Sequence, residues 1–263
     1  MSLLESASRP DTNRPLILTI YGPAGCGKTS LACTFEDAFL IRTQGEQLPR
    51  DVSEGQMPMA LPPLGSKLID VSGKKVWDKS ELFDQLTSLV KDEHNFKTVI
   101  FDSVTGLEDM FIQSVVDADP KKPKSIVQAA GGYGAGRAAV RALHSRVRKA
   151  AEILRERRGM NVIFLAHVEI DRLDPPDGDP YSSYSLQLHK ESAPIYVNSS
   201  DIVAFMKQDT IVMGEEGESK KAITTGQRYL SVDMTPASVS KNRLGIEKDI
   251  PVKKGENPFA EYM

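Results

Sequence analysis

The fold of this chain is decided by residues 22–29, which read Gly22-Pro23-Ala24-Gly25-Cys26-Gly27-Lys28-Thr29. They follow an apolar, β-branched run at residues 16–21 that predicts a buried strand, and residues 30–39 after them predict a helix. The octet fits the pattern G-x-x-x-x-G-K-[ST], the phosphate-binding P-loop, placed where that motif requires it, between a strand and a helix. An ordinary glycine-rich turn is the alternative interpretation, and the flanking elements disfavour it.

Each part of the octet has a chemical task. Glycines let backbone N–H groups turn towards phosphate oxygens, and the amino end of the following helix adds a partial positive charge. Lys28 is expected to reach the β- and γ-phosphates of ATP, and the hydroxyl of Thr29 to ligate Mg²⁺. The predicted nucleotide-binding residues are Gly22, Pro23, Ala24, Gly25, Cys26, Gly27, Lys28, Thr29 and Ser30.

A second strand of the same kind ends in an acid. Residues 98–103 read Thr98-Val99-Ile100-Phe101-Asp102-Ser103, a buried-strand pattern that ends at Asp102. Parallel strands bring their carboxyl ends to one edge of a sheet, where nucleotides bind. Asp102 is therefore predicted to hold Mg²⁺ together with Thr29, and Ser103 could support the metal shell.

The rest of the chain predicts one α/β domain over residues 15–252, with a mostly parallel twisted sheet, flanking helices and antiparallel strands at its carboxyl-terminal edge. Residues 1–14 are expected to form a flexible arm, residues 47–75 an irregular excursion and residues 253–263 a tail. Asp78 and Glu81 resemble a capping box that opens a helix. A long helix is expected around residues 140–154, a strand at 161–166 and a long loop at 169–194. Short strands are expected at residues 201–206, 211–213, 222–225 and 229–232.

Composition and charge exclude several classes of protein. The chain has 263 residues, 26% of them charged, and a formal net charge of −3. No apolar run is long enough to cross a bilayer. Cys26 and Cys33 are too far apart in a helix to form a disulfide, so a reducing, cytoplasmic setting is expected. Residues 120–158, however, hold eleven basic residues against Glu152 and Glu156. This segment predicts either a patch for a polyanion or a solvated helix face.

Hydrolysis of ATP requires a group that orients the attacking water and takes its proton. Gln44 and Glu46 follow the strand expected at residues 38–41, and His167 follows the strand at 161–166. All three are predicted to lie at the nucleotide edge of the sheet, with His167 near the γ-phosphate. The alternative for His167 is a strand-end histidine that pairs with a nearby carbonyl.

Four features of the sequence together resemble those of a known family. They are the P-loop, the strand ending Phe101-Asp102-Ser103, His167 at the end of Ile163-Phe164-Leu165-Ala166, and the run Lys241-Asn242-Arg243-Leu244-Gly245. This family is that of the phage-encoded RecA-like P-loop ATPases. They are AAA-type ATP-binding proteins and include single-strand annealing and recombination proteins. The likeness covers about residues 15–250.

The resemblance implies roles for individual residues. A carboxylate at the tip of the second strand activates water in that family, and alignment of the strand puts Gln44 there. Since an amide cannot take a proton, either Glu46 substitutes or hydrolysis is slow. The family's γ-phosphate sensor corresponds to His167. Its basic pair that reaches the nucleotide of a neighbouring subunit corresponds to Lys241 and Arg243, which without the family would be read as surface charge.

The resemblance also implies a homo-oligomer, either a ring or a filament, and loops that bind single-stranded DNA. The corresponding segments are residues 104–136 and 169–194. Acidic residues in the second segment argue against contact with a DNA backbone. The predicted DNA-binding residues are Lys121, Lys122, Lys124, Arg137 and Arg141.

These observations predict a Mg²⁺-dependent ATPase of phage DNA recombination or replication that binds single-stranded DNA and promotes annealing or strand exchange. It would act in the bacterial host cytoplasm, with a single-strand-binding protein or other recombination proteins as further partners. The main alternative is a nucleotide-gated ATPase that remodels or recruits a protein partner without direct DNA binding. A small-molecule P-loop kinase is disfavoured, because the chain shows no arginine-rich lid and would leave Lys241 and Arg243 without a role.

Overall fold

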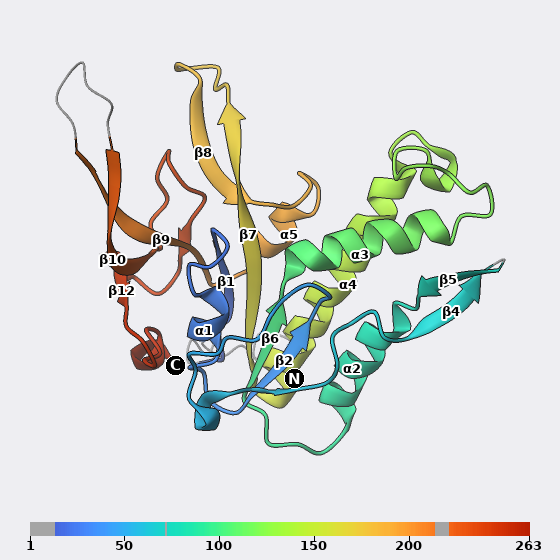
Figure 1. The fold of residues 1–263 in the computed structure, drawn as a ribbon, viewed down its shortest axis with the longest axis horizontal. Helices are drawn as coiled ribbons and strands as arrows, with labels where there is room; N and C mark the ends of the chain where they lie inside the picture. The colour runs from blue at the N-terminus through green and yellow to red at the C-terminus, as the bar shows by residue number, and fades with distance from the viewer. Residues whose placement is uncertain (1–13, 72, 214–220) are drawn as a thin grey trace, which may run out of the picture.

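The structure is a computed structural model that describes residues 14–71, 73–213 and 221–263. The arm expected at residues 1–14 lies outside the described residues except for Arg14. Figure 1 shows one central sheet with helices packed against it. Among the helices in these ranges, none combines the length and the apolar character that crossing a membrane would need.

The central sheet runs in the order β12-β10-β9-β1-β7-β6-β2-β3, with β11 paired to β9 and β8 paired to β7. The six strands from β9 to β3 in this order are parallel to one another, whereas β10, β12, β11 and β8 are antiparallel to their partners. The strands of this sheet are β1 (Ile17–Gly22), β2 (Ala38–Arg42), β3 (Met59–Ala60), β6 (Thr98–Asp102), β7 (Asn161–Leu173), β8 (Tyr181–Leu186), β9 (Ile202–Met213), β10 (Lys221–Ser231), β11 (Lys241–Asn242) and β12 (Ile250–Val252).

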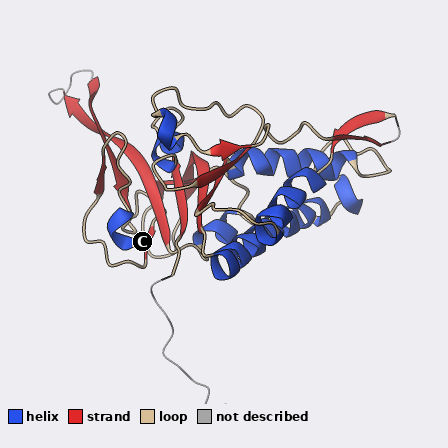
Figure 2. Cartoon of the chain, turned by 90° about the horizontal axis from the view of Figure 1, so that it is seen from below, coloured by secondary structure: helices blue, strands red, loops and turns tan. Residues whose placement is uncertain are grey.

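Helices cover both faces of the sheet. Figure 2 shows the three long helices packed together on one side. These are α2 (Ser80–Lys91), α3 (Val104–Asp117) and α4 (Ala135–Arg158). The short α1 (Lys28–Ala32) lies on the other face, and α5 (Ala193–Val197) precedes β9. The predicted α/β fold class, a mostly parallel sheet with flanking helices and antiparallel strands at the carboxyl-terminal edge, is confirmed.

Strand β1 shows why this sheet is central. All six of its residues are buried, and they alternate between the two cores. Ile17 and Tyr21 pack towards the three long helices, whereas Leu18 and Ile20 pack towards α1 and the chain's carboxyl-terminal part. A strand covered on both faces needs a continuous apolar run, which residues 16–21 supply.

The helix predicted at residues 30–39 is wrong in extent. Helix α1 ends at Ala32, and residues from Ala38 onwards already belong to β2. The hydroxyl of Thr34 donates to the carbonyl of Leu31, and Asp37 has a φ of 43°, so the chain turns directly into the next strand. Tertiary pairing of β2 with β6 overrides the helical pattern.

The loop predicted at residues 169–194 is wrong in extent, since only residues 174–180 and 187–192 lie outside strands and helices. Strand β7 continues to Leu173 and pairs with β8 in an antiparallel hairpin that rises above the sheet in Figure 1. This hairpin extends beyond the core, where Ile170, Leu173 and Tyr181 are exposed, so its strands are not the continuous buried apolar runs of β1 and β6. The short strands expected after residue 200 are likewise continuous, since β9 and β10 form one long hairpin.

The excursion at residues 47–75 contains regular structure. It holds a 3-10 turn at Glu54–Gln56, the strand β3, and a two-stranded sheet of β4 (Leu68–Val71) with β5 (Lys74–Trp77). The capping box of Asp78 and Glu81 does not form. Asp78 accepts a bond from the N–H of Ser80, while Glu81 accepts from the N–H of Gly65 and from Trp77 Nε1. Glu81 thus ties the excursion to α2.

Candidate nucleotide-binding site

The P-loop connects β1 to α1 and depends on its glycines. Gly25 and Gly27 have φ values of 74° and 100°, in the left-handed region that other residues rarely adopt. A Cβ atom on Gly22 would lie 2.4 Å from the carbonyl oxygen of Met206 on β9. Side chains at these positions would strain or displace the loop, so the structure requires glycine at all three.

Lys28 and Thr29 stand at the start of α1. Lys28 is buried, and its Nζ donates to the carbonyl oxygens of Gly22 at 2.8 Å and Pro23 at 2.9 Å. Thr29 Oγ1 donates to Asp102 Oδ2 at 2.8 Å. Strand β7 separates β1 from β6 in the sheet, but their carboxyl ends meet, and the predicted metal pair is brought together.

Lys28, Thr29 and Asp102 suit the binding of Mg²⁺ and a nucleoside triphosphate. Mg²⁺ in phosphate-transfer sites is held by one or two protein oxygens, substrate phosphates and water, and the pair of Thr29 and Asp102 offers a hydroxyl and a carboxylate. Burial raises the pKa of Asp102 to about 6, and the negative charge of Glu46 adds to the rise. A bound cation would lower this pKa, because it stabilises the ionised carboxylate. When bound, Mg²⁺ would neutralise charge on the β- and γ-phosphates.

The raised pKa of Asp102 predicts how an amide at this position changes stability. The ordinary pKa is 3.8, so the protonated carboxyl favours the folded state below about pH 4, and that contribution is lost as the pH rises through about 6. In metal-free protein, Asp102→Asn is therefore expected to raise the free energy of unfolding near pH 7 by on the order of 2 to 3 kcal/mol. Urea unfolding of the wild type and of Asp102→Asn, near pH 7 and near pH 4, measures this difference. An equal gain in the free energy of unfolding near pH 4 would contradict the prediction.

A second group of side chains lies beside Asp102. Glu46 Oε1 accepts a hydrogen bond from Ser103 Oγ at 2.8 Å and lies 3.0 Å from His167 Nε2. The hydrogen bond with His167 is the main reason that the pKa of Glu46 falls below its ordinary value, with a smaller contribution from Ser103. Glu46 is half-buried and ionised at neutral pH, which a proton acceptor requires. His167 pairs with this carboxylate.

Gln44 points elsewhere. Its side chain is exposed and packs over Gly65, where an added Cβ atom would lie 2.7 Å from Gln44 Nε2. The structure thus places Glu46 beside Asp102, Ser103 and His167, and it places Gln44 against the excursion. Alignment by strand position alone could not distinguish the two, because the turn after β2 decides which side chain faces the site.

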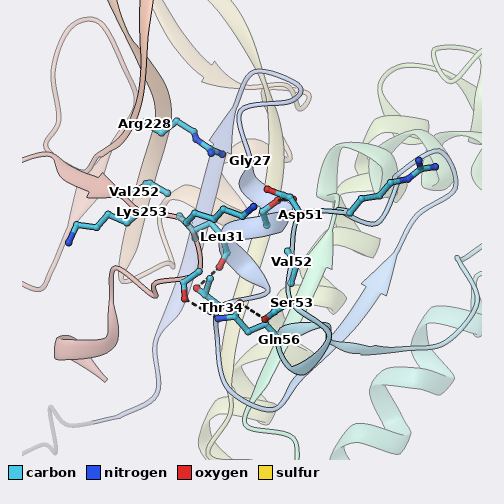
Figure 3. Close-up of a pocket in the computed structure, with 14 residues that line it drawn as sticks. Gly27, Leu31, Thr34, Asp51, Val52, Ser53, Gln56, Arg228, Val252 and Lys253 are labelled. Atoms are coloured by element: carbon cyan, nitrogen blue, oxygen red, sulfur yellow. Dashed lines mark hydrogen bonds between the residues drawn. The ribbon is translucent and has the colours of Figure 1, made fainter.

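A cleft of about 530 Å³ adjoins the P-loop (Figure 3). Its floor is formed by Ser30 and Leu31 of α1 and by the flanking Gly27 and Thr34. One wall comes from the excursion, including Asp51, whose carboxylate accepts a bond from Ser30 Oγ. The other wall comes from β10 and the carboxyl-terminal segment and includes Arg228, Val252, Lys253 and Lys254. Sequence reasoning missed these residues, since no motif marks them and Lys253 and Lys254 fall within the predicted tail.

Lys241 and Arg243 lie at the opposite edge of the sheet from the P-loop. Lys241 on β11 pairs with Val203 near the start of β9, and its Nζ donates to the carbonyl oxygens of Val197 and Asn198. Arg243 Nη1 lies 3.8 Å from Asp201, and its side chain is 51% exposed. Within one chain, the pair is not brought to the nucleotide site.

Seven of the basic residues of 120–158 fall into two groups. Lys121, Lys122, Lys124 and Arg141 are exposed, and Arg137 lies 3.9 Å from Glu108. Arg148 and Arg155 are buried, where Arg148 donates to the carbonyl of Ser199 and Arg155 lies 3.3 Å from Asp201. The exposed group sits around the connection from α3 to α4. The buried arginines hold α4 against the start of β9 and cannot contribute to a surface patch.

Comparisons with known proteins extend these observations. Residues 14–244 match the family described as an AAA domain. Among solved structures, the chain is similar to one titled "Crystal structure of the RadB recombinase", with 16% sequence identity and a TM-score of 0.42 over 82% of this chain and 80% of that chain. No curated protein matches it. Because the family match spans nearly the whole of the described α/β domain, this chain belongs to the AAA-domain family.

Proposed function

We propose that this protein is a RecA-like, Mg²⁺-dependent ATPase of phage DNA recombination or replication. The observation that carries the proposal is the contact of 2.8 Å between Thr29 and Asp102, with Glu46 and His167 directly beside it. Lys28 and the P-loop would bind the phosphates, Thr29 and Asp102 the metal, and Glu46 would take the proton of the attacking water. His167, paired with Glu46, would orient that carboxylate and sense the γ-phosphate.

We further propose that the protein binds single-stranded DNA through the connection from α3 to α4. Lys121, Lys122 and Lys124 are exposed there, and the exposed Tyr133 offers an aromatic face for base stacking. Arg137 and Arg141 continue this surface onto α4. The β7–β8 hairpin carries Glu169, Asp171, Asp174, Asp177 and Asp179, so it does not suit a phosphate backbone. Annealing or strand exchange is the proposed outcome of DNA binding.

A homo-oligomer is part of the proposal. In a head-to-tail assembly, two different surfaces of the subunit meet. Lys241 and Arg243 lie at the edge of the sheet opposite the P-loop, and in such an assembly they would reach the nucleotide of the next subunit. ATP binding would then tighten the interface, and hydrolysis would release it.

Sedimentation with a fluorescent single-stranded oligonucleotide and a non-hydrolysable ATP analogue tests both parts. The wild type is expected to bind the oligonucleotide and to assemble beyond a monomer. Replacement of Lys121, Lys122 and Lys124 by glutamine is expected to weaken oligonucleotide binding and to reduce the slope of log K against log salt by about 2.

The control replaces the exposed Lys75, Lys91 and Lys97 by glutamine, and should leave that slope unchanged. If the wild type binds no oligonucleotide with or without the analogue, the DNA proposal fails, and the ATPase that acts on a protein partner takes its place. A monomer under both conditions would remove the oligomer and the roles of Lys241 and Arg243.

A further inference from the structure

Arg228 on β10 lies against the P-loop of its own chain. Its Nη1 atom donates to the carbonyl oxygen of Cys26 at 3.3 Å. A Cβ atom built on Gly27 would lie 2.2 Å from the same Nη1 atom. The guanidinium therefore occupies the side of the loop that glycine leaves open, and Figure 3 shows the Arg228 side chain pointing towards Gly27.

The course of β10 explains how the side chain reaches this position. The pairing of β10 with β9 is irregular between Thr224 and Arg228 and becomes regular again at Arg228, which pairs with Gln208 on one side and Val252 on the other. Irregularities of this kind re-aim a side chain relative to its strand. Arg228 is half-buried, and among the residues that the structure describes, no carboxylate lies within ion-pairing distance of it.

The position of Arg228 along a bound nucleotide follows from the metal pair. Thr29 and Asp102 mark the end of the site where Mg²⁺ and the γ-phosphate would bind. Asp102 does not line the cleft, which extends from Gly27 and Ser30 past Leu31 and Thr34 and therefore suits the α-phosphate, ribose and base. Arg228 lines this cleft beside Gly27 and Ser30, where it meets the P-loop.

We propose that Arg228 binds the α-phosphate of the nucleotide from within the same chain. A half-buried guanidinium that no carboxylate of the described residues neutralises favours an anion, and hydrogen bonds from a charged donor to a phosphate are stronger than neutral ones. The contact is made to a phosphate shared by ATP and ADP, so Arg228 contributes to the affinity for both. The inference rests on the proposed nucleotide binding at Lys28.

The test compares the wild type with Arg228→Gln and Arg228→Lys by calorimetric titration with Mg²⁺-ADP and with a Mg²⁺-bound, non-hydrolysable ATP analogue. Arg228→Gln is expected to weaken the binding of both by a similar factor, about 10- to 100-fold. Arg228→Lys restores part of the loss, because it keeps the charge. Lys97→Gln is the control for loss of a cation, since Lys97 is exposed and pairs with Glu36, away from the P-loop. It should bind both nucleotides as the wild type does.

A second measurement separates contact with the α-phosphate from support of the loop. The two diastereomers of ADPαS place sulfur on different non-bridging positions of the α-phosphate. The wild type should prefer one diastereomer, and Arg228→Gln should lose that preference, whereas loss of loop support alone would leave it. Thermal unfolding without nucleotide checks that the variants are folded, and an unfolded Arg228→Gln leaves Arg228→Lys to carry the comparison of diastereomers.

The outcomes distinguish this inference from the proposed function. If the wild type binds nucleotide and both Arg228 variants keep its affinity and its preference, the inference is overturned and the proposed function stands. A loss confined to the ATP analogue would place Arg228 at the γ-phosphate and would also overturn it. If the wild type binds no nucleotide, the proposed function itself fails.

Discussion

Replacement of Glu46 by glutamine is expected to slow ATP hydrolysis by about 10²- to 10⁴-fold, the range in which a positioned proton acceptor contributes to turnover. Glu46 lies beside Asp102, Ser103 and His167, and its lowered pKa keeps it ionised at neutral pH. Glutamine has nearly the same shape and can still accept the bond from Ser103, but its amide cannot take a proton from water. Steady-state release of phosphate measures the effect.

Gln44→Ala is the matched control for this prediction. Gln44 belongs to the same turn, but its side chain packs over Gly65, so its loss should change turnover only slightly. ADP affinity should be the same in both variants as in the wild type, which separates loss of chemistry from loss of binding. The opposite order, with Gln44→Ala the slower enzyme, would assign the attacking water to Gln44.

Lys28→Ala is expected to lower the affinity for ATP by at least about 100-fold, because it removes a buried charge that would bind two phosphates. The variant also removes the hydrogen bonds that Lys28 Nζ donates to the carbonyls of Gly22 and Pro23, and so loosens the loop. Titration with a fluorescent ATP analogue measures the loss.

The exposed Lys97, which pairs with Glu36, supplies a control for the change of charge, and Lys97→Ala should bind as the wild type does. Thermal unfolding of Lys28→Ala without nucleotide shows whether the variant is folded. Tight binding by a folded Lys28→Ala would contradict the assignment of the P-loop.

The sequence by itself determined the parts of this protein that are local. The P-loop is a run of consecutive residues whose glycines and Lys28 carry their conformational and chemical requirements with them. Strands β1, β6 and the first half of β7 are buried on both faces, so the sequence of each is a nearly continuous apolar run. Asp102 and His167 follow such runs, which is why their place at the same edge of the sheet could be predicted.

The tertiary structure alone decided the parts that depend on distant contacts. The turn after β2 brings Glu46, and not Gln44, to Ser103 and His167. Antiparallel pairing turns the predicted loop at residues 169–194 into a hairpin and brings Arg228 to Gly27 across 201 positions of sequence. Packing buries Arg148 and Arg155, whereas Arg141, which precedes Arg148 by the same seven residues that separate Arg148 from Arg155, is exposed. The physical reason is that backbone conformation is encoded by neighbouring residues, whereas burial and charge pairing depend on which distant segments the fold places side by side.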